Sequence, residues 1–197
     1  MKPLAIIGIG AATGGLSALE QMLDNLPDGS GLAVVALLVL PRESDVQVAA
    51  LLQHHTGMAV RPIRNGVLFQ ADSIYVTTVQ AQVTVRDGRF AADPDADAHY
   101  PIDALFASLA EEAGPRAVGV ILSGEGDDGT RGIRAIRAAG GTVVVQHPLS
   151  AHADGMPRHA IATGVCDDIL YPHQIPLFLL KLRAGRQAGA GRVFSAV

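Results

Sequence analysis

The segment GIGAATGG, residues 8–15, has the glycine spacing of a turn that could do chemistry between a strand and a helix. Such a turn can hold a phosphate on helix amides, or it can raise a nucleophile to the rim of a parallel sheet. Its tip reads Ala11-Ala12-Thr13, with no serine or cysteine at the centre. The third glycine of a dinucleotide fingerprint would be one place late, and only Glu43 is acidic near the end of the next strand. Anion binding and a purely structural turn both stay open.

A second glycine-rich loop carries two carboxylates. In GEGDDG, Asp127 and Asp128 stand directly before a predicted helix, where acids interact favourably with the helix dipole or cap its free amides. In open α/β sheets the ligand crevice lies beyond the carboxyl ends of the strands. We therefore expect the loops 8–15, 39–45 and 123–130 to meet there.

The order of elements predicts an α/β fold, a doubly wound and mostly parallel sheet with helices on both faces. Strands are predicted at 4–9, 32–40, 117–124, 142–146 and 165–170, and helices at 16–26, 45–55, 102–113, 130–139, 156–163 and 172–184. Residues 58–92 are short, β-branched and partly alternating segments, which we interpret as an antiparallel β-hairpin insert. In the second helix, the spacing places Val46, Ala49, Leu51 and Leu52 on one side.

Composition limits the classes of function. The chain has 197 residues, of which 49% are hydrophobic, and a formal net charge of −4, which gives no basic field for nucleic acid. Its one cysteine, Cys166, excludes an intrachain disulfide and a multi-cysteine metal site, and we interpret it as a small buried apolar residue. No apolar run reaches the ~18 residues of a membrane span, and no signal peptide is evident.

We therefore expect a soluble cytoplasmic protein with no membrane insertion. Residues 1–184 are predicted to form a single domain, and the glycine-rich residues 185–197 a flexible tail or linker. Because the chain begins almost directly on a strand, it could be a domain of a longer protein. No cofactor and no metal are expected.

Four segments together resemble a known family. They read GIGAATGGLSALEQML, YPIDALFASLAEEAG, VGVILSGEGDDGTRGIRAIRAAGG and DGMPRHAIATGVCDDIL, and they follow one another in order between residue 4 and about residue 180. They resemble the catalytic domain of the CheB family, the bacterial chemotaxis protein-glutamate methylesterases. The phrases PIDALFASLA and GMPRHAIATG are most similar to the subgroup in which this domain is fused to a methyltransferase and sensor modules.

The resemblance implies a Ser-His-Asp triad that is incomplete here. The position of the nucleophilic serine holds Ala12, and the position of the histidine falls on Val39, while the aspartate is present as Asp128. Around these positions the resemblance implies a crevice formed by Thr13, Gly14, Glu125, Asp127 and Met156, with Glu125 where the family usually has a small or apolar residue.

Other side chains were weighed as substitutes for the missing groups. The hydroxyl of Ser17 is expected to be buried or to cap a helix, and Thr13, Ser44 and Ser123 are weak nucleophile candidates. His54 and His55 are predicted to lie away from the crevice. His147, His152 and His159 offer the best route to an imidazole near it, although their sequence favours a surface loop.

An acyl transfer needs a nucleophile, a base and oxyanion donors, and Ala12 and Val39 supply neither of the first two. The leading hypothesis is a catalytically inactive methylesterase-like domain, retained for protein interaction or regulation. Its expected partners are methyl-accepting receptors or signalling domains such as a receiver, a methyltransferase or a sensor kinase. The alternatives are an active methylesterase or glutaminase with a non-standard nucleophile, and anion or nucleotide binding at the 8–15 loop.

Overall fold

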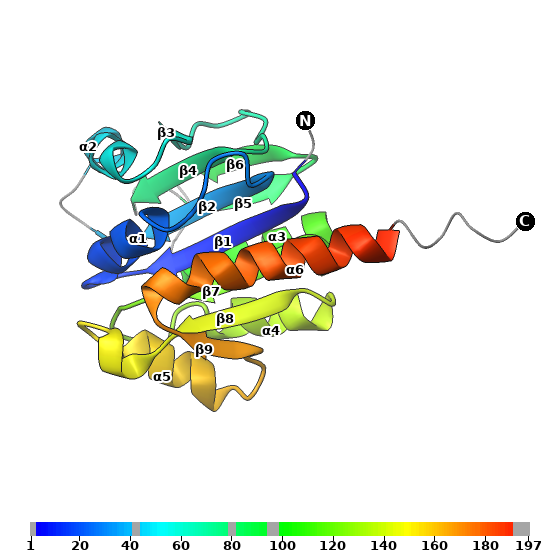
Figure 1. Cartoon of the computed structure of the whole chain (residues 1–197). Helices are drawn as coiled ribbons and strands as arrows, with labels where there is room; N and C mark the ends of the chain where they lie inside the picture. Colours follow the sequence, from blue (N-terminus) through cyan, green and yellow to red (C-terminus); the bar gives the residue numbers. More distant parts are fainter. Residues whose placement is uncertain (1–2, 41–43, 79–81, 94–98, 191–197) are drawn as a thin grey trace, which may run out of the picture.

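A seven-stranded parallel sheet forms the centre of the molecule (Figure 1). The structure, a computed structural model, describes residues 3–40, 44–78, 82–93 and 99–190, with side chains up to residue 185. The strands of this sheet are β1 (Ala5–Ala11), β2 (Leu32–Leu38), β3 (Ala59–Pro62), β4 (Ser73–Thr78), β7 (Ala117–Ile121), β8 (Thr142–Gln146) and β9 (Asp168–Leu170). They lie in the order β3-β4-β2-β1-β7-β8-β9, and every neighbouring pair is parallel.

Helices cover both faces of the sheet, as the sequence predicted. They are α1 (Gly15–Leu23), α2 (Asp45–Leu52), α3 (Pro101–Ala113), α4 (Thr130–Ala138), α5 (Gly155–Ala162) and α6 (Ile175–Ala190). The apolar cluster on one face contains side chains of α1, α2 and α6, and the cluster on the other face contains side chains of α3, α4 and α5. The central strands are buried on both sides, which explains their unbroken apolar sequences.

The antiparallel insert is smaller than predicted. Among the described residues, β5 (Gln82–Arg86) and β6 (Arg89–Asp93) form the hairpin, and Leu68 adds an isolated antiparallel bridge to Arg89, whereas β3 and β4 are parallel members of the main sheet. The prediction was wrong for β3 and β4. Strand β3 is a partly exposed edge strand. Its mixed polar and apolar sequence resembles that of an antiparallel strand, and side-chain alternation does not report strand direction.

Two helices also differ from their predictions. In α2, Val48, Ala49 and Leu52 are buried, but Val46 is 60% exposed and Leu51 is 42% exposed. Apolar residues of α2 point to nearly all sides of the helix, so their spacing could not determine which side faces the sheet. The last helix, α6, continues to Ala190, beyond its predicted end at residue 184, so the proposed tail would start later; residues 191–197 lie outside the described part of the chain.

The glycines of β1 serve helix packing. Gly8 and Gly10 both lie inside the strand, although the turn was predicted to begin at Gly10. A Cβ on Gly8 would lie 2.5 Å from Cδ1 of Leu109, and one on Gly10 would collide with Ile102. Both obstructing side chains belong to α3, so the absence of side chains at these positions lets α3 approach the strand closely. Only Gly14, with φ of 76°, has the left-handed conformation that the turn itself requires.

Candidate functional site

The loops after β1 and β7 meet at the point where the strand order reverses, as predicted. The chain runs outward from β1 to β2 and then returns to β7 on the other side, which is where open α/β sheets bind ligands. The amide of Ala12 donates a 2.9 Å hydrogen bond to the carbonyl of Ser123. The amide of Val39 donates a 2.8 Å hydrogen bond to the carbonyl of Ala11. Residues 41–43 of the third predicted loop lie outside the described residues.

The nucleophile and histidine positions implied by the resemblance are both apolar. Ala12 is 9% exposed and Val39 is half-buried, and both pack in the apolar cluster on the α3 side. Met156, 1% exposed, lies near Ala12, because a Cβ on Gly124 would collide with the Sδ of Met156 and lie 2.8 Å from Cβ of Ala12. Met156 therefore forms a buried wall of the site. A methyl group cannot attack a carbonyl and an isopropyl group cannot accept a proton.

The third position, Asp128, holds its carboxylate against the backbone of α3. Its Oδ2 accepts a 3.0 Å hydrogen bond from the amide of Ile102, and its Oδ1 accepts one of 3.0 Å from the amide of Asp103. The amide of Gly129 also donates to Oδ1, at 2.8 Å. Among the described residues, no side-chain hydroxyl or imidazole hydrogen bonds to this carboxylate. The helix that it caps is α3, about 25 residues upstream, rather than the helix that follows it.

Burial raises the pKa of Asp128 above its usual value of 3.8. The hydrogen bonds from the amides of Ile102 and Asp103 oppose this shift, and the negative charge of Asp103 adds to it. The smallest contribution is the hydrogen bond from Gly129, which also lowers the pKa. Desolvation is therefore stronger than the hydrogen bonding that favours the ionised form.

The remaining predicted crevice residues lie around the turn and the second loop. Thr13, Glu125 and Asp127 are exposed, and Gly14 is half-buried. The carboxylate of Glu125 points at the start of α5, since a Cβ on Gly155 would lie 2.9 Å from its Oε2. Glu125 thus stands exposed at the edge of the 123–130 loop, facing the start of α5.

None of the candidate substitutes replaces the missing groups at Asp128 in the described structure. Ser44 caps α2 through a 3.2 Å hydrogen bond from the amide of Gln47, and Ser17 is exposed rather than buried or capping as predicted. His55 lies away from the site, as predicted, with its Nδ1 2.9 Å from Oδ1 of Asp24.

The three histidines considered as substitutes for the missing base also make no hydrogen bond to Asp128 in the described structure. His147 stacks on Tyr171 with ring centroids 5.0 Å apart, and its Nδ1 accepts a hydrogen bond from the amide of Leu149. Nδ1 of His159 lies 2.8 Å from the carbonyl oxygen of Gly126. His152 is exposed and lies closest to the turn, because a Cβ on Gly14 would collide with it.

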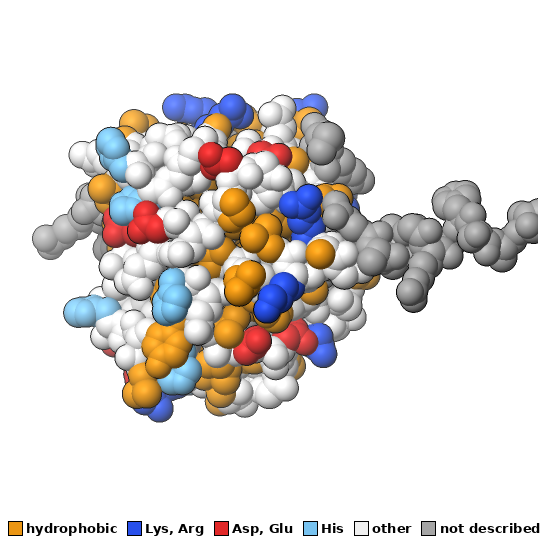
Figure 2. Space-filling model, in the orientation of Figure 1, with side chains coloured by type: hydrophobic (Ala, Val, Ile, Leu, Met, Phe, Trp, Pro, Cys, Tyr) orange, Lys and Arg blue, Asp and Glu red, His pale blue; other side chains and the backbone are white. Residues whose placement is uncertain are grey.

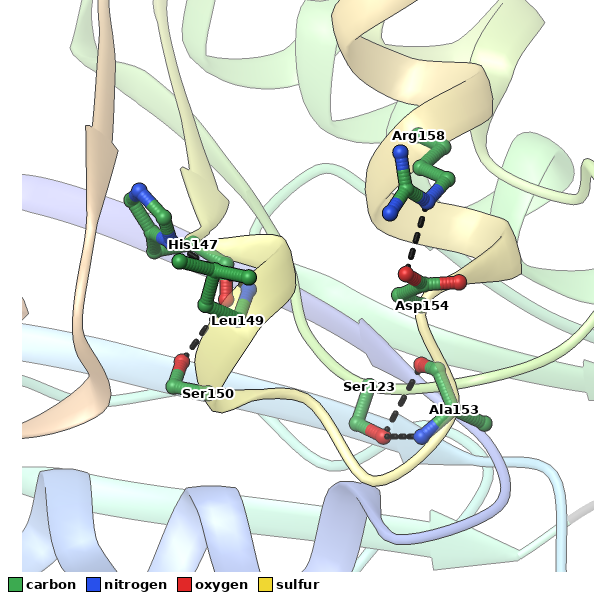
Figure 3. A network of polar contacts seen from close by, with 7 residues as sticks. All are labelled: Ser123, His147, Leu149, Ser150, Ala153, Asp154 and Arg158. Atoms are coloured by element: carbon green, nitrogen blue, oxygen red, sulfur yellow. Dashed lines mark hydrogen bonds and ion pairs between the residues drawn. The ribbon is translucent and has the colours of Figure 1, made fainter.

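Ser123 ties the loops of the site together (Figure 3). It is fully buried, and its Oγ lies within donating distance of the carbonyls of Thr13, at 2.8 Å, and Ala153, at 3.1 Å. The same oxygen accepts a 2.9 Å hydrogen bond from the amide of Ala153. Its own amide donates to Oε1 of Gln146 at 2.7 Å. Ser123, considered above as a weak nucleophile, is therefore a structural joint, which links three loops by hydrogen bonds.

A polar cavity of about 330 Å³ lies between this joint and α1. It is lined by Thr13, Gly14, Ser17, Ala18, Gln21, Gln146, Ser150 and His152. Gln146 was not among the predicted site residues; it is 1% exposed and donates from Nε2 to Oγ of Ser150 at 3.2 Å. A signal was present, because Gln146 is the polar last residue of an apolar strand at the carboxyl edge of the sheet.

The described part of the chain shows neither a metal cluster nor a membrane-spanning helix. No group of three or more His, Cys, Asp and Glu side chains is placed to hold a metal ion, and no helix has the length and apolar character to cross a membrane. Cys166 is half-buried against the α3-side cluster, and burial together with the charge of Asp167 raises the pKa of its thiol.

Comparison with known proteins supports the resemblance seen in the sequence. The CheB methylesterase family matches residues 7–179. The crystal structure of the Thermotoga maritima CheB methylesterase catalytic domain superposes with a TM-score of 0.85 at 26% identity, covering 90% of this chain and 98% of that one.

Curated relatives extend the same similarity. A protein-glutamate methylesterase/protein-glutamine glutaminase of Moorella thermoacetica is 32% identical over 92% of this chain and 45% of its own length. A 104.1 kDa uncharacterized protein from the hypE 3' region of Rhodobacter capsulatus is 40% identical over 74% of this chain and 16% of its own length. The chain thus spans about half or less of these relatives. It belongs to the CheB methylesterase family.

Proposed function

We propose that this chain is a catalytically inactive methylesterase-like domain of a bacterial chemotaxis or related signalling system, retained to bind a protein partner. The observation that carries the proposal is the pair Ala12 and Val39 at the ends of β1 and β2. They occupy the two reacting positions of the family's triad with groups that have no lone pair or proton to use. A triad works as a unit, so the loss of both members removes almost all of its rate acceleration.

The exposed apolar side chains support a role in protein binding. Hydrophobic groups gather over α6 on the face shown in Figure 2. Leu149 is 82% exposed and Leu177 is 57% exposed, and Tyr171, whose ring stacks on that of His147, is 38% exposed. Hydrogen bonds at His147 and Ser150 hold the turn that presents Leu149 (Figure 3). Apolar side chains held outward in this way are typical of protein interaction sites.

The two competing functions lack comparable support. An active methylesterase with another nucleophile needs a hydroxyl or imidazole at Asp128, whereas the partners found in the described residues are backbone amides. Nucleotide binding at residues 8–15 rested on the spacing of Gly8 and Gly10, and these glycines lie within β1 under the side chains of α3.

An ester-hydrolysis assay tests the proposal. Methanol release from a methylated receptor peptide should not exceed that of heat-denatured protein, while the Moorella thermoacetica relative, as positive control, releases methanol under the same conditions. Release that scales with the concentration of this chain and stops on heating would overturn the proposal. Calorimetric titration with the same receptor fragment tests the binding role, and Leu149→Gln should weaken any binding through the apolar surface.

A further inference from the structure

The first turns of α3 and α4 lie against each other, and neither helix is capped by its own N-cap side chain. The N-cap residues, Tyr100 of α3 and Gly129 of α4, make no side-chain cap hydrogen bond. The first amides of any helix have no acceptor within the helix, and burial without an acceptor is costly. The amides of Ile102 and Asp103 in α3 and of Gly132 in α4 find their acceptors across the junction between the helices.

The exchange is reciprocal. Asp128, which precedes α4, accepts hydrogen bonds from the second and third amides of α3, those of Ile102 and Asp103. Asp103, in the first turn of α3, accepts a 2.7 Å hydrogen bond through Oδ1 from the amide of Gly132, in the first turn of α4. Both carboxylates also face the positive ends of the helix dipoles that they cap.

Two further contacts define how closely the helices approach. The guanidinium carbon of Arg131 lies 4.9 Å from the ring centroid of Tyr100, which adds a cation–π contact across the same junction. A Cβ on Gly132 would lie 2.5 Å from Cβ of Phe106 and 3.1 Å from Cα of Asp103. The crossing hydrogen bonds therefore depend on a backbone approach that only glycine permits at residue 132.

We propose that Asp128 and Asp103 form a crossed pair of helix caps that holds the 123–130 loop against the first turn of α3. In this assignment Asp128 is a positioning residue, and its role does not require ester hydrolysis. The inference goes beyond the proposed function and does not rest on it, because the hydrogen bonds are present whether or not positions 12 and 39 can react.

The two carboxylates differ in the number of hydrogen bonds that they accept, and this difference allows a specific test. Asp128 uses both oxygens and accepts from three amides. Asp103 uses Oδ1 alone, and its Oδ2 is buried with no hydrogen-bond partner in the described structure. An asparagine at residue 103 can keep its single hydrogen bond, whereas an asparagine at residue 128 must turn an NH₂ group toward a backbone N–H.

Native-state amide hydrogen exchange on the full chain tests the crossed caps. Asp128→Ala should accelerate exchange at Ile102 and Asp103 by at least about tenfold, the factor for a lost hydrogen bond of about 1.4 kcal/mol. Asp127→Ala is the matched control, since Asp127 is adjacent and exposed, and it should leave these rates unchanged. Asp103→Ala should accelerate exchange at Gly132, and Asp103→Asn should not.

Equal rates at Ile102 and Asp103 in Asp128→Ala and Asp127→Ala would overturn the assignment. If Asp128→Ala does not fold, Asp128→Asn serves instead, because it keeps one acceptor oxygen. It should still accelerate exchange at one of the two α3 amides relative to Asp127→Asn, and no acceleration would again overturn the proposal. No ester substrate enters the experiment, so its outcome is independent of the test of the proposed function.

Discussion

Ala12 and Val39 are direct neighbours across the β1–β2 pair. The parallel register matches Ala11 with Leu38, and the hydrogen bond from the Val39 amide to the Ala11 carbonyl continues it by one residue. Neighbouring strands lie about 4.8 Å apart, so side chains at these two positions are within reach of each other. The two positions to which the resemblance assigns the nucleophile and the base therefore lie side by side, as the proposed function requires.

The double substitution Ala12→Ser with Val39→His should restore measurable ester hydrolysis. The carboxylate of Asp128 has about four acceptor positions, of which three are occupied, so one remains for an imidazole N–H. Each single substitution should stay at background because triad members act as a unit. Methanol release from methylated peptide checks all four proteins, and a serine variant alone as active as the double variant would show that residue 39 is not the site of the base.

The raised pKa of Asp128 predicts a specific dependence of stability on pH. The folded state binds the proton more tightly than the unfolded chain, so the contribution of Asp128 to stability falls as pH rises from 3.8 through the raised value. Asp128→Asn removes this contribution. The unfolding free energy of each protein is measured in urea between about pH 3 and pH 7. The value for the natural chain minus the value for Asp128→Asn should therefore decline as the pH rises and then level off. A difference that rises with pH would show that hydrogen bonding to the ionised form is stronger than burial.

Gly132→Ala should destabilise the domain by about 1–3 kcal/mol, because the new methyl group would be forced against Phe106 and the backbone of Asp103. Gly185→Ala is the matched control, since this glycine is also helical and nothing lies within 4 Å of a Cβ there. That control should be neutral or stabilising by up to about 1 kcal/mol, as expected from helix propensity. Denaturant midpoints compare the two, and equal effects would contradict the close helix approach.

Ser123→Ala should cost about 1–3 kcal/mol of unfolding free energy, because it leaves the buried amide of Ala153 without its acceptor. Ser17→Ala provides the comparison from an exposed hydroxyl on the same cavity, and its effect should stay within about 0.5 kcal/mol. Thermal unfolding measures both. A Ser123 variant as stable as the Ser17 variant would argue against the joint between the loops.

The bounds of an element could be predicted from the sequence where the element is buried on both faces. Strand β8 was predicted with its observed bounds, 142–146, because its centre is an unbroken run of three valines that is buried on both faces. Strand direction at β3 and the buried side of α2 could not be predicted. The first depends on partners far away in the chain, and the second on a helix that has apolar residues on nearly every side.

At the site, the sequence located the loops but not the bonds between them. Asp128 was singled out for two reasons, as a triad member by resemblance and as a helix cap by position. Asp128 does cap a helix, but that helix is α3, which begins at Pro101. No local sequence pattern connects residues that far apart. Gly10 was assigned to the turn because glycine spacing cannot show which side chains fill the space above a strand.

Backbone and side chain contribute differently at Ala12, Val39 and Asp128, the positions to which the resemblance assigns the triad, and this difference has an evolutionary consequence. Ala12 and Val39 contribute to the fold through main-chain hydrogen bonds that any non-proline residue could make. Their side chains can therefore drift once selection for turnover is relaxed. The side-chain carboxylate of Asp128 accepts hydrogen bonds from α3, so selection for folding alone would remove mutations at this position. In a saturation scan for soluble protein, the first two positions should tolerate many residues and the third very few.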